Sequence, residues 1–334
     1  MAANTNRSNE TNINYDYADY SSYKVATDVQ VAVILMISIV GTPVNLWFLA
    51  ALLSSADVRS RFRNKIICNN CILHLVTCVI ILPVVAYFYF NYKYISCVQH
   101  SILWHLYFMI ELAGNWQLVI LIAVFLAQIK DFDPTSKLSS GAATLGTIGL
   151  LVFPWAASLV IIPVITHEYW KYSSYLYYGC LGIHPDSGEV FRSIDTAVPL
   201  VLAVVLVIIA AFFKYRRFNL RDSSRSMRVE LIGRGPEIDN TLFYVVAVAV
   251  AIVCDLPQLL VRFDVFVPGI RSLHWFITII VSQIVSEIRV ILMPITWLLL
   301  PDVRQRIKTW RPWYRPSPGI DLTMTYTKET TSEE

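Results

Sequence analysis

The chain has 334 residues, of which 56% are hydrophobic and 15% are charged, and its formal net charge is +3. This composition, with a mean hydropathy of +0.54, excludes an ordinary soluble domain. A helix needs about 20 apolar residues to cross a bilayer. The sequence therefore predicts an all-α membrane protein, a bundle of seven transmembrane helices with spans at 28–54, 65–90, 98–129, 141–166, 192–214, 240–266 and 273–300.

The segment before the first span, residues 1–27, is predicted to be an extracellular, flexible and glycosylated tail. It contains two N-glycosylation sequons, which begin at Asn6 and Asn9. It lacks the apolar core of a cleavable signal peptide, so we expect the first span to act as the insertion signal.

Tyrosines alternate with acidic residues in this tail. Such a polar stretch is not expected to fold alone. Tyr15, Tyr17 and Tyr20 are candidates for sulfation, and sulfated tyrosines would present strong hydrogen-bond acceptors to a basic protein ligand. The alternative is a tail that serves only to solvate this end of the chain.

The basic residues predict the orientation of the chain. Loops after the first, fifth and seventh spans are rich in arginine and lysine, whereas the loops between them contain few. By the positive-inside rule, the N-terminus is expected outside and the C-terminus in the cytoplasm of a cell whose plasma membrane the chain crosses several times. The basic face is expected to meet the lipid bilayer at its anionic surface.

Two of the six cysteines lie where oxidation is expected. Cys97 begins the third span on the outer side, and Cys180 lies in the outer loop after the fourth span. A disulfide between them would hold this loop over the bundle. The other four cysteines fall inside spans, where a thiol behaves as a small buried hydrophobe.

Charged side chains interrupt several spans. An ionised group is costly in lipid, so Glu111, Asp255, Glu287 and Arg289 are expected to face the interior and find partners. Arg289 could pair with Glu111 and Asp255, because a guanidinium stays charged and can bind two groups at once. This network is either a structural ion pair or part of a switch.

Two further polar residues have simpler interpretations. His74 is more often a neutral, hydrogen-bonded histidine than a proton sensor. Asn45 is expected to form an interhelical hydrogen bond. We find no metal-ligand spacing, no phosphate-binding loop and no nucleophile with a base, so we expect no enzyme activity, no cofactor and no nucleic-acid partner.

After the last span, residues 301–312 are predicted to form a short amphipathic helix, and residues 313–334 a disordered cytoplasmic tail. Threonines and a serine lie among glutamates there. Thr327, Thr330, Thr331 and Ser332 are candidate phosphorylation sites, and their phosphates would suit the cationic surface of arrestin. A tail without such a role is the alternative.

Over residues 28–312 the chain resembles the rhodopsin-like G protein-coupled receptors, particularly the peptide and chemokine receptor branch. The resemblance depends on landmarks that occur in order: Gly41-Thr42-Pro43-Val44-Asn45-Leu46, Asn69-Asn70, Pro83, the Cys97 and Cys180 pair, Trp155 with Pro163, Pro199, Cys254-Asp255-Leu256-Pro257, and Met293-Pro294-Ile295-Thr296-Trp297.

The activation motifs of that family are altered. Its acidic residue in the second helix falls at His74 or Leu75, its tryptophan in the sixth is Asp255, and Met293 and Trp297 replace the asparagine and tyrosine of the seventh. No arginine occurs at the inner end of the third span, where the family has one. Ordinary coupling to a transducer is therefore in question.

The resemblance implies a receptor for an extracellular peptide or chemokine-like ligand, which signals through a heterotrimeric G protein, arrestin or both. It implies ligand contacts at Trp104, Phe108, Arg262 and Gln283, and a movement of the sixth helix about Pro257. It also implies a transducer-facing inner surface that contains Lys130, Arg216, Arg217 and Trp297.

Two other classes of function remain open. The altered motifs are also compatible with a decoy or a constitutively active receptor, including one of viral origin. A transporter would require internal repeats and broken helices, and neither is evident in the sequence. Ion conduction through the charged core has no support from a motif.

Overall fold

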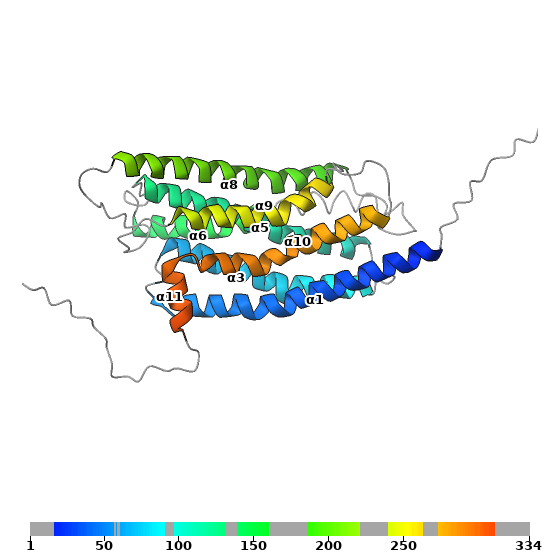
Figure 1. Cartoon of the computed structure of the whole chain (residues 1–334). Coiled ribbons are helices and arrows are strands. Elements are labelled where there is room, and N and C mark those ends of the chain that lie inside the picture. Colours follow the sequence, from blue (N-terminus) through cyan, green and yellow to red (C-terminus); the bar gives the residue numbers. More distant parts are fainter. Residues whose placement is uncertain are drawn as a thin grey trace, which may run out of the picture.

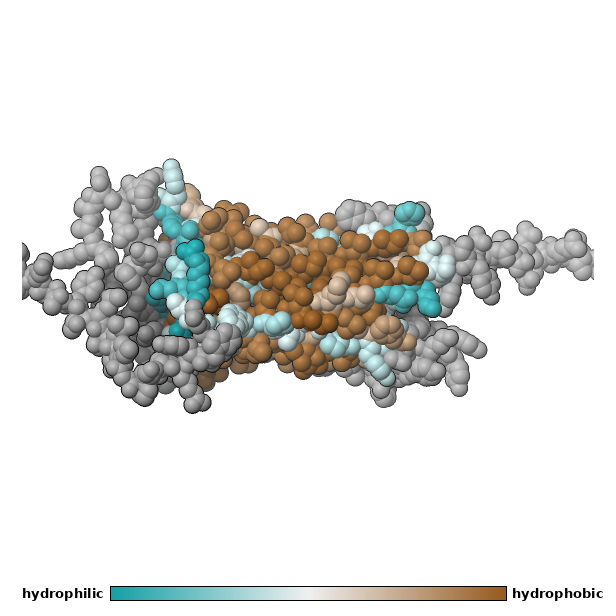
Figure 2. Space-filling view, turned by 60° about the horizontal axis from the view of Figure 1, so that its bottom comes forward, coloured by the Kyte–Doolittle hydropathy of each residue, from teal (hydrophilic) through white to brown (hydrophobic). Residues whose placement is uncertain are grey.

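The computed structural model describes residues 17–56, 58, 61–90, 97–130, 139–159, 186–220, 240–262 and 273–310. Within these ranges the chain is helical, and seven helical segments are long and apolar enough to cross a membrane. They lie side by side as an elongated bundle (Figure 1). On the face that Figure 2 shows, apolar residues form a belt over the middle of the bundle, and hydrophilic residues gather towards its ends. The predicted seven-helix membrane bundle is therefore confirmed.

The spans correspond to the following elements, in chain order: α1 (Tyr17–Leu53); α3 (Phe62–Val76), η1 (Thr77–Ile81) and α4 (Leu82–Phe90), which form one continuous rod; α5 (Cys97–Ile129); α6 (Ser140–Leu159); α8 (Asp186–Leu220); α9 (Thr241–Arg262); and α10 (Leu273–Trp297). The short helix α11 (Pro301–Thr309) follows α10 and crosses one end of the bundle (Figure 1).

Two helices are longer than the predicted spans. Helix α1 begins at Tyr17 rather than at residue 28, so part of the segment expected to be flexible is helical. Helix α8 extends from Asp186 to Leu220, beyond both ends of the predicted 192–214. Hydropathy measures only the apolar part of a helix, and in both cases the added turns are polar and continue past the apolar stretch.

The second span contains a π-helical turn, η1, just before Pro83. Leu82 donates its backbone N–H to the carbonyl of Thr77, and Pro83 has no N–H to give to the next carbonyl, that of Cys78. The Ser38 hydroxyl on α1 donates to the Cys78 carbonyl instead. A proline in a membrane helix is tolerated when a neighbour satisfies the freed backbone group in this way.

Helix α1 approaches its neighbours closely at Gly41. A Cβ at this position would lie 2.6 Å from the Cys78 sulfur and 3.3 Å from a methyl carbon of Val290. One turn later, the Asn45 side-chain amide donates to the carbonyls of Gly41 and Val290, each at 2.9 Å. These contacts fix α1 against α10, as small residues and interhelical amide bonds do in membrane bundles.

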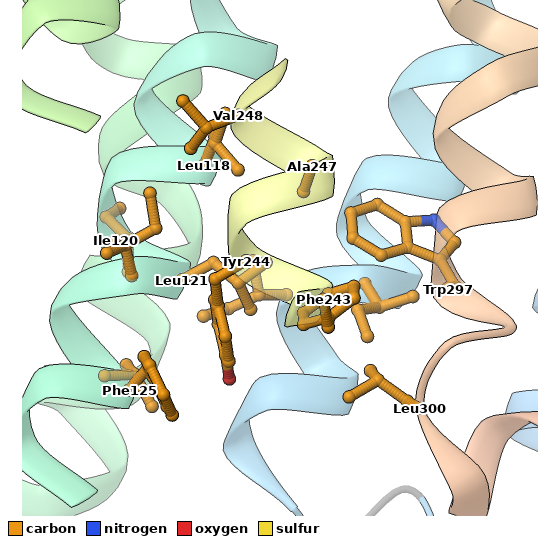
Figure 3. Close-up of a cluster of buried hydrophobic side chains, with 14 of the residues drawn as sticks. Leu118, Ile120, Leu121, Phe125, Phe243, Tyr244, Ala247, Val248, Trp297 and Leu300 are labelled. Atoms are coloured by element: carbon orange, nitrogen blue, oxygen red, sulfur yellow. The ribbon is translucent and has the colours of Figure 1, made fainter. Parts of the chain in front are cut away.

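The end of the bundle that carries α11 has a large apolar core (Figure 3). The Phe125 ring on α5 stacks on Tyr244 of α9 with centroids 3.9 Å apart. Phe243 lies against both Tyr244, at 4.7 Å, and Trp297 of α10, at 5.5 Å. This aromatic cluster, Phe125, Tyr244, Phe243 and Trp297, packs α5, α9 and α10 closely together.

Four free cysteines lie inside the described bundle: Cys68, Cys71, Cys78 and Cys254. All four are buried, as expected for thiols within spans.

Candidate functional site

A polar cavity of about 40 Å³ lies within the bundle, between the α11 end and the opposite end. It has room for about two or three water molecules. Residues of α3, η1, α5, α9 and α10 line it: His74, Thr77, Glu111, Gly114, Asp255, Ser286, Glu287, Arg289 and Val290. The structure thus brings together all the charged residues that the sequence analysis placed inside the spans.

Arg289 on α10 is the centre of this site. Its Nη1 donates to the carboxylate of Asp255 on α9, and to Oδ1 of Asn115 on α5 at 2.7 Å. Asp255 is completely buried, and Arg289 is 5% exposed. One guanidinium nitrogen therefore joins three helices that are distant in sequence.

The cavity contains more hydrogen-bonding capacity than these contacts use. Nε and Nη2 of Arg289, Nδ2 of Asn115 and Nδ1 of His74 are buried and have no partner among the described residues. Three carboxylates, those of Glu111, Asp255 and Glu287, line the same cavity. The cavity thus combines buried nitrogens that have no hydrogen-bond partner among the described residues with several acidic side chains.

Gly114 makes room for this arrangement. A Cβ at Gly114 would lie 3.2 Å from Nη2 of Arg289 and 3.5 Å from Leu73. The absence of a side chain on α5 therefore lets the guanidinium lie directly against the helix, beside Asn115. The sequence analysis did not single out Gly114, although a glycine next to an intramembrane asparagine is a recognisable sign of a close approach.

The structure also settles which residue of the second span faces this cavity. His74 lines it and is 3% exposed, whereas Leu75 is not among its lining residues. Nearby, the Asn69 amide donates to the Leu151 carbonyl of α6 at 2.9 Å and accepts from the Trp155 indole at 3.1 Å. Two of the landmarks quoted for the receptor resemblance are thus in contact.

Among the predicted ligand contacts, the structure describes the side chain of Gln283. Gln283 is 3% exposed, and its amide oxygen accepts from Gln30 of α1 at 2.7 Å. The same Gln30 nitrogen donates to the Tyr89 hydroxyl at 3.2 Å. Gln283 is therefore engaged in an interhelical hydrogen bond, a role that the sequence analysis did not consider.

Of the other predicted site residues, some have only their backbone described, and the rest lie outside the described ranges. The helical residues whose side chains are not described are Tyr17, Tyr20, Cys97, Trp104, Phe108, Arg217 and Arg262. The residues outside the described ranges are Asn6, Asn9, Tyr15, Cys180, Thr327, Thr330, Thr331 and Ser332. Sulfation, glycosylation, phosphorylation and the Cys97–Cys180 disulfide remain predictions.

The predicted transducer-facing residues lie at the α11 end, with one important difference. Arg216 and Lys130 are exposed, and the Lys130 ammonium lies 4.2 Å from the centroid of the Phe213 ring. Trp297, however, is 2% exposed and belongs to the aromatic cluster. In this conformation the Trp297 ring lies in the core, so it does not face a partner.

No family model matches this sequence, and no curated protein matches it.

Proposed function

We propose that this chain is a rhodopsin-like G protein-coupled receptor at the plasma membrane, with its N-terminus outside, and that it binds a peptide or chemokine-like ligand. The observation that carries the proposal is the bond network from Arg289 on α10 to Asp255 on α9 and Asn115 on α5. These are the helices whose relative position must change if the bundle is to signal. The ordered landmarks in the sequence and the Asn69–Trp155 contact support the same assignment.

The network has the properties of an element with two alternative arrangements. A buried ion pair adds little net stability, because desolvation offsets its attraction, but a single unpaired partner costs about 3–5 kcal/mol. Any arrangement that separates Asp255 from Arg289 must therefore supply a replacement partner. Glu111 and Glu287 line the same cavity and provide one for the guanidinium. A ligand that prefers the second arrangement would shift the population of the two states.

The aromatic cluster would connect this element to the inner surface. Helix α9 contains both Asp255 and, three turns earlier, Phe243 and Tyr244. A rotation of α9 about Pro257 would separate the Phe125–Tyr244 stack and open a space next to the exposed Lys130 and Arg216. That space is where we place the G protein or arrestin.

A decoy or constitutively active receptor is the second candidate. The inner end of α5 favours this candidate. The described residues from Leu126 to Lys130 include no arginine, and the Lys130 ammonium lies over the Phe213 ring. A receptor without an arginine there lacks the contact to a transducer that the resemblance implies.

The test is recruitment of G protein and of arrestin in cells that express the full chain, first without ligand and then with a panel of chemokines. We expect Arg289→Met to change the basal signal per molecule at the cell surface, measured at surface expression matched to that of the unmodified chain. The matched control is Lys24→Met, which removes an exposed cation at the opposite end of the bundle. Unchanged signalling in Arg289→Met at equal expression would contradict a regulatory role of the network. Bound chemokine without recruitment would identify the decoy.

A further inference from the structure

Helix α11 lies across the end of the bundle, at the edge of the apolar belt (Figures 1 and 2). Its apolar side faces the protein, because Val303 is completely buried and Ile307 packs against the core. Just past its last turn, the Trp310 ring lies edge-on to Trp47 of α1, with centroids 4.8 Å apart. Trp47 is itself 37% exposed. Paired tryptophans of this kind mark the level where hydrocarbon meets headgroups.

Part of the charge on α11 is used to attach it to the bundle. Arg306 donates to the Ala51 carbonyl at 3.2 Å and to the Ser54 hydroxyl at 2.6 Å, at the end of α1. Asp302 accepts from Arg63 at 2.6 Å and from Arg61 at 3.2 Å. These contacts hold the helix parallel to the expected membrane surface.

Two cations on α11 are not used in this way. Arg304 and Lys308 are exposed and have no partner among the described residues. They are four positions apart, so they lie on the same side of the helix, directly beside the stripe of Val303 and Ile307. Their side chains can therefore extend along the apolar surface and place both charges at headgroup level.

We propose that Arg304 and Lys308 bind the phosphate of an anionic lipid, with the Trp47–Trp310 pair against the start of its acyl chains. A guanidinium and an ammonium together suit a phosphate, since the first binds two oxygens and the second adds a point charge. The lipid would cover the junction of α1 and α11. The site depends only on α11 lying at the bilayer surface, and not on the proposed receptor function.

Native mass spectrometry of the full chain in neutral detergent tests this site, with phosphatidylglycerol and phosphatidylcholine as probes. We expect phosphatidylglycerol to be retained in preference to phosphatidylcholine. Each basic residue near an anionic surface contributes about fivefold in affinity, so Arg304→Gln/Lys308→Gln should weaken phosphatidylglycerol binding by about tenfold or more. The exchange Arg304→Lys/Lys308→Arg keeps both charges and should bind within about twofold of the unmodified chain.

The matched control is Lys130→Gln/Arg216→Gln, which removes two exposed cations at the same end of the bundle. An equal loss of lipid in this control would overturn the proposal, because it would indicate a general effect of charge. Unchanged binding in Arg304→Gln/Lys308→Gln would also overturn it. Displacement of the lipid by excess inorganic phosphate would show a site for a free anion and contradict the lipid assignment.

Discussion

Arg289 and Asp255 occupy the interior of a membrane protein, where an unpaired buried charge is costly. Both side chains are nearly or completely buried, and each lies within reach of the other. Such a pair contributes little net stability, because desolvation offsets its attraction. The cost of the pair is therefore expected to appear only when one partner is removed.

We expect Arg289→Met to lower the free energy of unfolding by about 3–5 kcal/mol, because Asp255 would remain buried without its guanidinium. The double variant Asp255→Leu/Arg289→Met should lose less than Arg289→Met alone, since both charges are then absent. Denaturant unfolding in detergent measures the difference. A double variant that loses the sum of the two single changes would show that the two residues act independently.

Gly114 tests the fit of the guanidinium against α5. The added methyl of Gly114→Ala would lie 3.2 Å from Nη2 of Arg289. We expect Gly114→Ala to lower the free energy of unfolding by about 1–2 kcal/mol through this overpacking. When it is added to Arg289→Met, the same substitution should lower it further by a much smaller amount. Thermal unfolding gives both values.

Gly149→Ala is the control, because a Cβ at Gly149 would meet nothing within 4 Å. Alanine in place of an unhindered helical glycine should stabilise by up to about 1 kcal/mol. If Gly114→Ala behaves in the same way as this control, the guanidinium is not held against α5.

At the scale of elements, the carboxylate of Asp302 is one of the groups that attach α11 to the bundle. Asp302 accepts from Arg63, from Arg61 and from Asn64, the last at 3.1 Å. Burial alone would raise the pKa of Asp302, but Arg63, Asn64 and Arg61 together lower it below its ordinary value. Arg63 is 2% exposed, so Asp302 neutralises a buried cation.

We expect Asp302→Asn to weaken the attachment of α11 by about 2 kcal/mol, because charged hydrogen bonds are replaced by neutral ones. Hydrogen exchange of the α11 amides should become faster by about tenfold or more. Unchanged exchange would show that Arg306 and the apolar stripe alone hold the helix.

The lowered pKa of Asp302 also predicts a pH dependence. Its stabilising contribution should be complete above the ordinary carboxyl pKa, about 4, and should disappear as the pH falls through the lower pKa of the folded state. The α11 amides of Asp302→Asn should not show this acid transition.

For the whole molecule, orientation is the prediction that the proposed receptor function requires. If the N-terminus is outside, Asn6 and Asn9 pass through the secretory compartments and become glycosylated. An endoglycosidase should then shift the mobility of the full chain, and Asn6→Gln/Asn9→Gln should abolish the shift. An epitope tag after Glu334 should be accessible only in permeabilised cells. A tag accessible in intact cells would reverse the orientation.

The spans could be predicted from sequence because hydropathy depends on composition alone, and the inward-facing charges could be predicted because lipid excludes them. Partners were harder to predict. The Arg63–Asp302 and Gln30–Gln283 contacts join residues more than 200 positions apart. The rotation of each helix about its own axis decides whether His74 or Leu75 faces the cavity and whether Trp297 is buried. Counting residues along the sequence does not determine that rotation.

The reactivity of the four buried thiols reports when the helix bundle opens. A cysteine reacts with a maleimide only when its sulfur reaches solvent, and Cys254, next to Asp255 on α9, is 1% exposed. Its rate of alkylation therefore measures how often α9 departs from its neighbours. A cysteine introduced on the surface can be labelled before the buried ones react, so no native cysteine has to be removed.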